Sequence, residues 1–213
     1  MPRERDATRA LFDRWAETYN TDTSAPSGPL VGYNESLQAL DGMVTVRAGA
    51  ALLDIGMGTG SLAALFEQRT AEITGIDVSR QMLSKCQDAH PNFQLEEGSF
   101  TEIPFADATF DIVVSSFTFH EVEPDHRVAA CSEVARVVRP GGQLVILDIM
   151  FPSEAAVNEA RHSIGPSWDP DEEYPLVGQL DTQLRRNGFT SLRWRQSGPY
   201  HWIVFARRQE AER

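Results

Sequence analysis

The chain has 213 residues, of which 41% are hydrophobic, and a formal net charge of −12. This length fits one domain with a sizeable core, and the acidic balance argues against a broad nucleic-acid or anionic-membrane surface, which would need clustered basic side chains. No apolar run approaches the roughly 20 residues that span a bilayer. Cys86 and Cys131 lack the spacing of a disulfide framework or a zinc site. We therefore expect a cytoplasmic protein, monomeric or homodimeric, that holds no metal and acts on a small molecule.

The first 45 residues are expected to form a helical segment that can act as a lid. Apolar residues from Leu11 to Tyr19 recur at helical spacing, which predicts an amphipathic helix over residues 7–19. The prolines, the glycine and the small polar residues of 21–29 then favour a loop. Helical spacing resumes over residues 33–44 and leads into the first strand.

A glycine-rich loop organises the chain. A strand-like apolar run ends in Asp54, and the chain then turns through Gly56, Gly58 and Gly60. Glycines at alternate positions omit the β-carbons that would keep a flat ligand away from the backbone, and they permit positive φ values. A second strand ends about twenty residues later in Asp77, where doubly wound sheets hold an acid that accepts hydrogen bonds from the hydroxyl groups of a ribose. These features predict a nucleoside site.

The rest of the pattern alternates strands with helices and ends in a hairpin. Strands are expected at 51–54, 72–77, 93–97, 110–116, 143–150, 189–196 and 200–206, and helices at 62–66, 125–138, 153–162 and 176–184, with a further helix capped by Ser79. The nearly continuous apolar run at 110–116 is typical of a central parallel strand that helices cover on both faces.

The run D-x-G-x-G-x-G at 54–60 resembles motif I of the class I S-adenosylmethionine-dependent methyltransferases. A dinucleotide fingerprint needs G-x-G-x-x-G, whereas Ser61 stands at its third glycine position. The Phe-x-x-Trp-Ala-x-x-Tyr pattern of the first helix, Pro-Gly-Gly at 140–142 and the closing hairpin extend the resemblance over the whole chain. It is most similar to small bacterial methyltransferases of the YrrT type. The resemblance implies a Rossmann-like α/β fold with a doubly wound sheet of seven strands, mostly parallel, with an antiparallel strand in the C-terminal hairpin and helices on both faces.

The resemblance also implies S-adenosylmethionine as cofactor and S-adenosylhomocysteine as product. It implies a single domain over 1–213, with the cofactor-binding core at 50–150 and a substrate-side insertion, last helix and hairpin at 151–213. The cofactor-binding residues that it implies are Tyr19, Asp54, Gly56, Met57, Gly58, Gly60, Asp77, Val78, Met82, Ser99, Phe100, Ser115, Ser116 and Phe117. Relatives carry an acid or an amide near Ser99 to bind the adenine amino group, so this role is open between Ser99, the Phe100 backbone and a neighbouring carboxylate.

His120 is the candidate catalytic residue. It follows the strand at 110–116, at the edge where ligands of doubly wound sheets collect, and it could position the acceptor or remove its proton. Packing alone is the structural alternative. With His120, the candidate acceptor-binding residues are Trp15, Trp168 and Tyr174. The expected reaction is an in-line methyl transfer to a nitrogen, oxygen, sulfur or carbon nucleophile of a small molecule, with an NAD(P)-dependent oxidoreductase and a non-catalytic S-adenosylmethionine-binding module as the alternatives.

Overall fold

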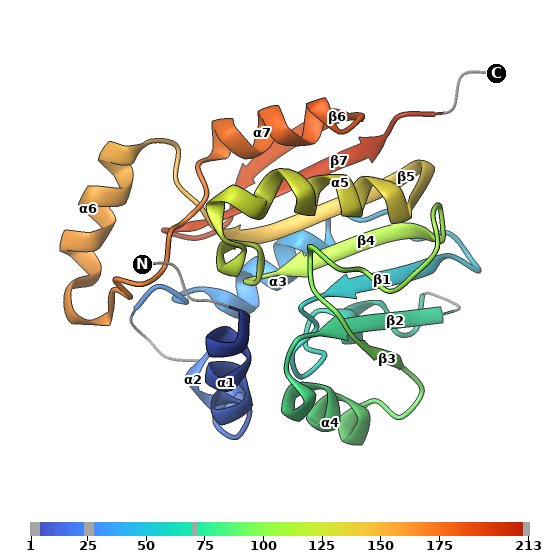
Figure 1. Cartoon of the computed structure of the whole chain (residues 1–213), viewed down its shortest axis with the longest axis horizontal. Coiled ribbons are helices and arrows are strands. Elements are labelled where there is room, and N and C mark those ends of the chain that lie inside the picture. Colours follow the sequence, from blue (N-terminus) through green and yellow to red (C-terminus); the bar gives the residue numbers. More distant parts are fainter. Residues whose placement is uncertain (1–4, 24–27, 70–71, 211–213) are drawn as a thin grey trace.

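The fold is built on one seven-stranded sheet, seen in a computed structural model that describes residues 5–23, 28–69 and 72–210 (Figure 1). The strands are β1 (Ala51–Ile55), β2 (Glu72–Asp77), β3 (Gln94–Glu97), β4 (Phe110–Ser116), β5 (Val138–Ile149), β6 (Phe189–Gln196) and β7 (His201–Arg208). Their order is β3-β2-β1-β4-β5-β7-β6. The first five strands pair in parallel, and β7 runs antiparallel between β5 and β6. The predicted topology, including the antiparallel hairpin strand, is confirmed.

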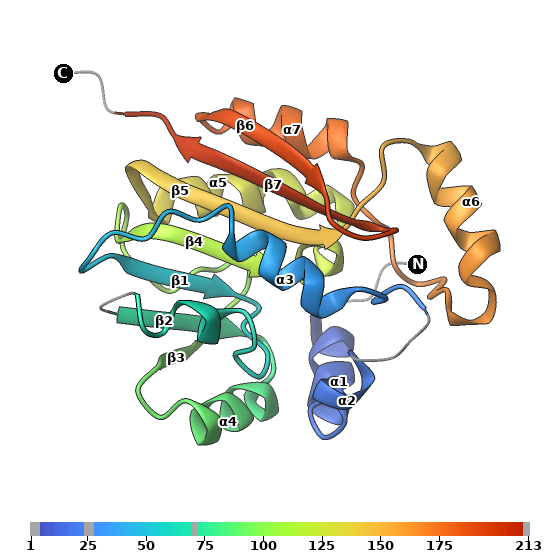
Figure 2. The same cartoon turned by 180° about the vertical axis from the view of Figure 1, so that it is seen from behind.

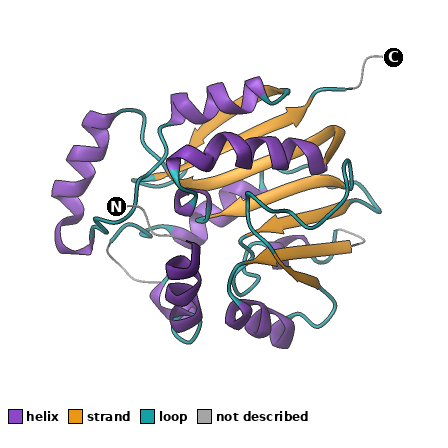
Figure 3. Cartoon of the chain, viewed as in Figure 1, coloured by secondary structure: helices purple, strands orange, loops and turns teal. Residues whose placement is uncertain are grey.

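Helices cover both faces of the sheet (Figures 2 and 3). The α-helices are α1 (Arg5–Trp15), α2 (Tyr19–Asp22), α3 (Tyr33–Asp41), α4 (Arg80–Ala89), α5 (Arg127–Val137), α6 (Glu154–Ile164) and α7 (Val177–Arg186), and the 3₁₀ turns are η1 (Ala63–Phe66), η2 (Phe119–Glu121), η3 (Pro124–His126) and η4 (Gly165–Ser167). α5 and α7 lie on the face toward the viewer in Figure 1, and α3 lies on the opposite face. α1, α2 and α6 gather at the end of the sheet where the parallel strands finish. Within the described ranges, no helix combines the length and apolar character that a membrane crossing requires.

Each face of the sheet has its own buried core. Leu52 and Leu53 are neighbours in β1 and both are fully buried, but they belong to the two different cores because successive strand residues point to opposite faces. Leu37 of α3 packs in the first core, and Leu184 of α7 packs in the second. This double burial explains why the central strands read as continuous apolar runs.

Several predicted elements differ in extent or type, and three of the differences have a clear cause. The helix expected over 7–19 ends at Trp15, because the side chains of Trp15 and Thr18 both donate to Asp22, each at 2.7 Å, and turn the chain into α2. The helix expected at 62–66 is only the 3₁₀ turn η1, since β2 begins soon after it at Glu72.

The third difference is in β5, which begins at Val138 instead of 143. The predicted Pro-Gly-Gly turn therefore lies within this strand. Its pairing with β4 jumps from Phe110 opposite Val138 to Ile112 opposite Gln143, and Gly141 has a φ of 76°. Residues 139–142 thus form a bulge opposite Asp111, in which extra backbone is accommodated between paired residues.

A buried polar network fastens α3 to β7. Ser36 and His201 are fully buried, and Ser36 Oγ lies 2.9 Å from His201 Nδ1. His201 Nε2 lies 2.8 Å from the Pro29 carbonyl, which can only accept, so Nε2 carries the proton and Nδ1 accepts from Ser36. Ser197 Oγ in turn donates to Ser36 Oγ at 3.0 Å.

Ser36→Ala is expected to lower the free energy of unfolding by about 1–3 kcal/mol, because it leaves His201 Nδ1 buried without a donor. Denaturant unfolding measures the change. Glu35→Ala, at an exposed position of the same helix, is the matched control and should stay within about 0.5 kcal/mol of the wild type. Equal stability of the two variants would show that the network contributes little.

Candidate functional site

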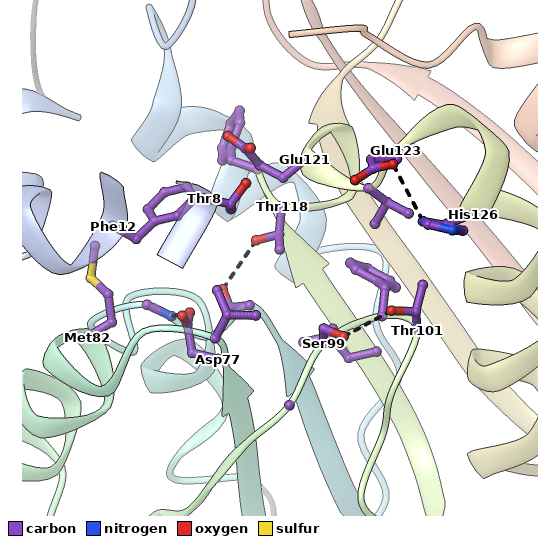
Figure 4. Close-up of a pocket in the computed structure, with 18 of the residues that line it drawn as sticks. Thr8, Phe12, Asp77, Met82, Ser99, Thr101, Thr118, Glu121, Glu123 and His126 are labelled. Atoms are coloured by element: carbon purple, nitrogen blue, oxygen red, sulfur yellow. Dashed lines mark hydrogen bonds and ion pairs between the residues drawn. The ribbon is translucent and has the colours of Figure 1, made fainter. Parts of the chain in front are cut away.

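A cavity of about 340 Å³ lies at the carboxyl ends of β1, β2 and β4 (Figure 4). Its lining residues are Thr8, Phe12, Tyr19, Ile55, Gly56, Gly58, Asp77, Val78, Met82, Gly98, Ser99, Phe100, Thr101, Phe117, Thr118, Glu121, Val122, Glu123 and His126. Asp77 and Met82 stand on one side and Ser99 and Thr101 on another, while Phe12 approaches from α1. This is the position where open α/β sheets bind their ligands.

The glycine loop is held against β2 by its own backbone. The amides of Gly56 and Met57 both donate to the Ile76 carbonyl, at 2.8 and 3.0 Å. Gly56, Gly58 and Gly60 have φ values of 70°, 55° and 90°, in the region that favours glycine. A β-carbon on Gly56 would lie 2.2 Å from the side chain of Thr118, whereas one on Gly58 would meet nothing within 4 Å. Gly58 therefore leaves open space at the cavity wall.

The carboxylate of Asp77 binds the backbone of the glycine loop and of the turn that follows β2. Its Oδ1 accepts from the Ser79 amide at 2.8 Å, and its Oδ2 accepts from the Gly58 amide at 2.9 Å. Burial raises the pKa of Asp77 to about 6, although these two amides and that of Val78 favour the charged form. The carboxylate is thus ionised at neutral pH and lies on the cavity wall.

α1 lies against the segment of the cavity wall that follows Asp77. Ser79 Oγ donates to Asp13 at 2.6 Å while accepting from the Met82 amide at 3.1 Å, which confirms Ser79 as the N-cap of α4. Arg9 Nε donates to the Val78 carbonyl at 3.0 Å. The N-terminal helix is therefore bonded to the segment that carries Asp77.

A second cavity, of about 480 Å³, adjoins the first. Its lining residues are Leu11, Phe12, Arg14, Trp15, Thr18, Tyr19, Pro29, Leu30, Phe117, His120, Glu121, Ile149, Ser167, Asp169, Glu172 and Tyr174. Phe12, Tyr19, Phe117 and Glu121 line both cavities. Phe117 has a φ of 51°, which is uncommon for a bulky side chain and marks local backbone strain at this shared wall.

His120 is fixed at the inner end of the second cavity by Asp148. The fully buried Asp148 carboxylate accepts from the His120 amide at 2.9 Å and from His120 Nδ1 at 2.5 Å. Burial alone would lower the pKa of His120. The carboxylates of Asp148, Glu172 and Glu121 outweigh it and raise that pKa to about 10. The raised pKa favours the protonated imidazole at neutral pH, in which both ring nitrogens are donors.

Most of the predicted cofactor residues line the first cavity. They are Tyr19, Gly56, Gly58, Asp77, Val78, Met82, Ser99, Phe100 and Phe117. The others do not line it: Asp54, Met57, Gly60, Ser115 and Ser116. Met57 packs on Cys86, with 3.4 Å between the sulfur atoms. A β-carbon on Gly60 would face Cys86 and His90, so its positive φ serves packing. Ser115 Oγ donates to the Ile55 carbonyl at 2.7 Å and joins β4 to β1.

Asp54 is 1% exposed, and its carboxylate oxygens have no hydrogen-bond partner of normal geometry among the described residues, although the backbone amide of Ala63 lies near enough to favour the charged form. Burial and the charge of Asp77 raise its pKa well above the usual value.

Of the predicted acceptor residues, Trp15, His120 and Tyr174 line the second cavity. Trp168 stands behind them, with its ring 4.9 Å from that of Tyr174.

Sequence reasoning missed Glu121, Asp148 and Glu172. Glu121 follows the predicted His120 directly, and Asp148 is the one acid within the apolar run 144–150, a pattern that indicates a buried partner for a polar group. No local pattern distinguishes Glu172 among the acids of its loop. Phe12, a residue of the predicted N-terminal helix, also lines both cavities.

The comparisons with known proteins agree with this geometry. Residues 53–146 match the family model described as a methyltransferase domain. An uncharacterized methyltransferase of Alkaliphilus oremlandii is 29% identical over 177 residues, which cover 81% of this chain and 80% of the relative. The crystal structure of the YcgJ protein from Bacillus subtilis has a TM-score of 0.70 at 17% identity and covers 84% of this chain and 100% of its own.

An S-adenosylmethionine-dependent methyltransferase from Mesorhizobium loti has a TM-score of 0.64 at 20% identity, covering 80% of this chain and 96% of its own. At these identities the solved structures show the fold, and the family model covers residues 53–146. Residues 53–146 are therefore similar to a methyltransferase domain, and the chain has the fold of solved S-adenosylmethionine-dependent methyltransferases.

Proposed function

We propose that this protein transfers a methyl group from S-adenosylmethionine, held in the first cavity, to a small-molecule nucleophile held in the second. The observation that supports this most is the shared wall of Phe12, Tyr19, Phe117 and Glu121, which brings two cavities of small-molecule size together. A donor and an acceptor bound side by side in this way are what a direct transfer requires.

The residues of the first cavity fit the cofactor. Asp77 presents an ionised carboxylate to the hydroxyl groups of a ribose, and Val78, Met82 and Phe100 offer apolar surface for adenine. Gly58 leaves room over the loop.

When bound, S-adenosylmethionine supplies a methyl group on a sulfonium centre, which a nucleophile attacks from the side opposite the sulfur. The protein then has to align the acceptor and exclude water, and alignment of this kind reaches effective molarities of about 10⁵ M or more. With its pKa raised to about 10, His120 fits a positioning role and not that of a general base.

Affinity for S-adenosylhomocysteine is expected to rise about tenfold between about pH 5 and pH 7, because the ribose binds the ionised form of Asp77, whose pKa is about 6. Calorimetric titration across this range measures it, and Asp77→Asn should bind weakly with a flat profile. In the ligand-free protein, the raised pKa of Asp77 makes the free energy of unfolding fall as the pH rises. The contribution of Asp77 is present below its unfolded pKa of 3.8 and is lost as the pH rises through 6. An affinity that does not change with pH would contradict the assignment.

The reaction is tested by mass-spectrometric detection of S-adenosylhomocysteine with a panel of amines, alcohols, thiols and carbon acids. Turnover with one class supports the enzyme. Tight cofactor binding without turnover on any class would favour the non-catalytic module, and protection from thermal unfolding by NAD or NADP instead would favour an oxidoreductase. Ligand at about 100 times its dissociation constant adds about 2.7 kcal/mol of stability, which makes the comparison easy to measure.

A further inference from the structure

The second cavity carries an excess of negative charge. Among the described residues, the carboxylates of Glu121, Asp169 and Glu172 line it, and Asp148 lies directly behind His120. The cations at this cavity are the His120 imidazolium and Arg14, which is exposed on α1. The side chains of Glu121 and Glu172 are only 9% and 16% exposed. Three carboxylates thus line a poorly hydrated space with Arg14, while Asp148 pairs with His120 behind it, an arrangement that favours a cationic occupant.

The carboxylates of Glu121 and Glu172, which flank His120 Nε2, mark where such an occupant would lie. His120 is 8% exposed, and its Nδ1 is bonded to Asp148. Its Nε2 lies 3.7 Å from Glu121 Oε1 and 3.9 Å from Glu172 Oε1, which is longer than a hydrogen bond. His120 Nε2 and the carboxylates of Glu121 and Glu172 therefore converge on one point of the cavity wall.

Aromatic rings form the rest of the surface. Trp15, Tyr19, Phe117 and Tyr174 line the cavity, and the Tyr174 ring lies 5.7 Å from that of His120. The faces of aromatic rings attract cations, and more strongly where water is excluded. At about 480 Å³ the cavity is far larger than a metal ion needs. Charge, ring composition and size together favour a small organic ammonium ion.

We propose that the methyl acceptor is a primary or secondary amine, which enters as its ammonium ion and is recognised by Glu121, Glu172 and the aromatic wall. This inference rests on the proposed function of the two cavities. Glu121 lines both of them and is the carboxylate at the shared wall. The ammonium ion gives one proton to the Glu121 carboxylate. The freed nitrogen lone pair forms the nitrogen–carbon bond, the carbon–sulfur bond breaks with its electrons on sulfur, and the N-methylated product keeps the positive charge while the proton on Glu121 passes to solvent.

Binding is tested by calorimetry on the protein saturated with S-adenosylhomocysteine, with 2-phenylethylamine and its matched alcohol, 2-phenylethanol, as probes. The amine is expected to bind at least about tenfold more tightly than the alcohol, because only the amine carries the charge. Glu172→Gln should weaken the binding of the amine by about tenfold and leave the affinity for the alcohol unchanged. Glu173→Gln, at an exposed position of the same loop, is the matched control and should bind like the wild type.

Methyl transfer gives the second readout. Mass spectrometry is expected to find the N-methylated amine, and Glu121→Gln should lower kcat by about tenfold or more, most strongly at low pH, where the ammonium form prevails. Equal affinity for amine and alcohol, in a protein that binds S-adenosylhomocysteine, would overturn the inference and leave the proposed function standing. Failure to bind S-adenosylhomocysteine would overturn the proposed function itself.

A metal ion is the competing occupant, since ligand atoms of His120, Glu121 and Glu172 all lie within 4.8 Å of one another. Titration with Zn²⁺ and Mn²⁺ decides between the two. Micromolar metal binding that Glu172→Gln abolishes, together with amine affinity no greater than that of the alcohol, would replace the amine with a metal centre. Amine binding that persists in the presence of EDTA supports the ammonium site.

Discussion

Asp77→Ala is expected to weaken S-adenosylhomocysteine binding by more than about 100-fold at pH 7.5. A hydrogen bond to a charged group contributes about 1.5–3 kcal/mol, and the carboxylate can accept from two ribose hydroxyl groups. The substitution also removes the acceptor of the Gly58 amide, 2.9 Å from Oδ2, which helps to shape the glycine loop. Isothermal titration calorimetry measures the loss.

The stability of Asp77→Ala should stay close to that of the wild type. Burial of the ionised carboxylate opposes folding at neutral pH, as its raised pKa indicates, so its removal offsets part of the lost hydrogen bonding. Asp88→Ala, at an exposed position in α4, is the matched control and should bind within about twofold of the wild type. Near-normal affinity in a folded Asp77→Ala protein would place the ribose elsewhere.

Gly56→Ala is expected to lower the free energy of unfolding by about 2–5 kcal/mol. The φ of 70° costs a residue with a β-carbon about 1–2 kcal/mol. That β-carbon would also lie 2.2 Å from the side chain of Thr118, and such overpacking costs about 1–3 kcal/mol more. Thr118 cannot swing away freely, because its Oγ1 donates to the Ser116 carbonyl at 3.0 Å. Urea unfolding measures the change.

Gly58→Ala separates the two contributions. It has a similar φ of 55° but open space at the β-carbon position, so only the backbone cost of about 1–2 kcal/mol is expected. Because Gly58 lines the cavity, the added methyl group should weaken cofactor binding in a protein that stays folded. Thr118→Gly combined with Gly56→Ala should recover the overpacking part. Equal destabilisation by the two alanines would show that the contact with Thr118 is unimportant.

The sequence predicts the central strands well, because burial on both faces makes each of these short segments apolar. Residues 110–116 form β4 with the predicted bounds, since a strand covered on both faces is apolar throughout. The break after Trp15 could not be predicted, because it depends on two side chains that reach forward to Asp22. The bulge at Pro-Gly-Gly likewise depends on the pairing of β5 with β4. Local patterns thus give the elements, and contacts between elements set where they end.

The same distinction holds for the site. The spacing of Gly56, Gly58 and Gly60 predicts positive φ values, and all three have them. The spacing does not predict which way the α-carbon of each glycine faces. A β-carbon on Gly60 would meet Cys86 and His90 and would not line the cavity. The second cavity is formed by α1, residues 29–30, η2 and the loop after α6, which only the tertiary fold brings together. The pairing of His120 with Asp148, which changes the role open to the histidine, is of the same kind.

The central claim is that donor and acceptor cavities meet at Phe12, Tyr19, Phe117 and Glu121. A crystal structure of the protein with S-adenosylhomocysteine tests it most directly. We expect ribose hydroxyl groups within hydrogen-bond distance of Asp77 and a sulfur atom that faces the shared wall and the second cavity. A nucleoside bound away from Asp77, or a sulfur atom turned away from that wall, would contradict it.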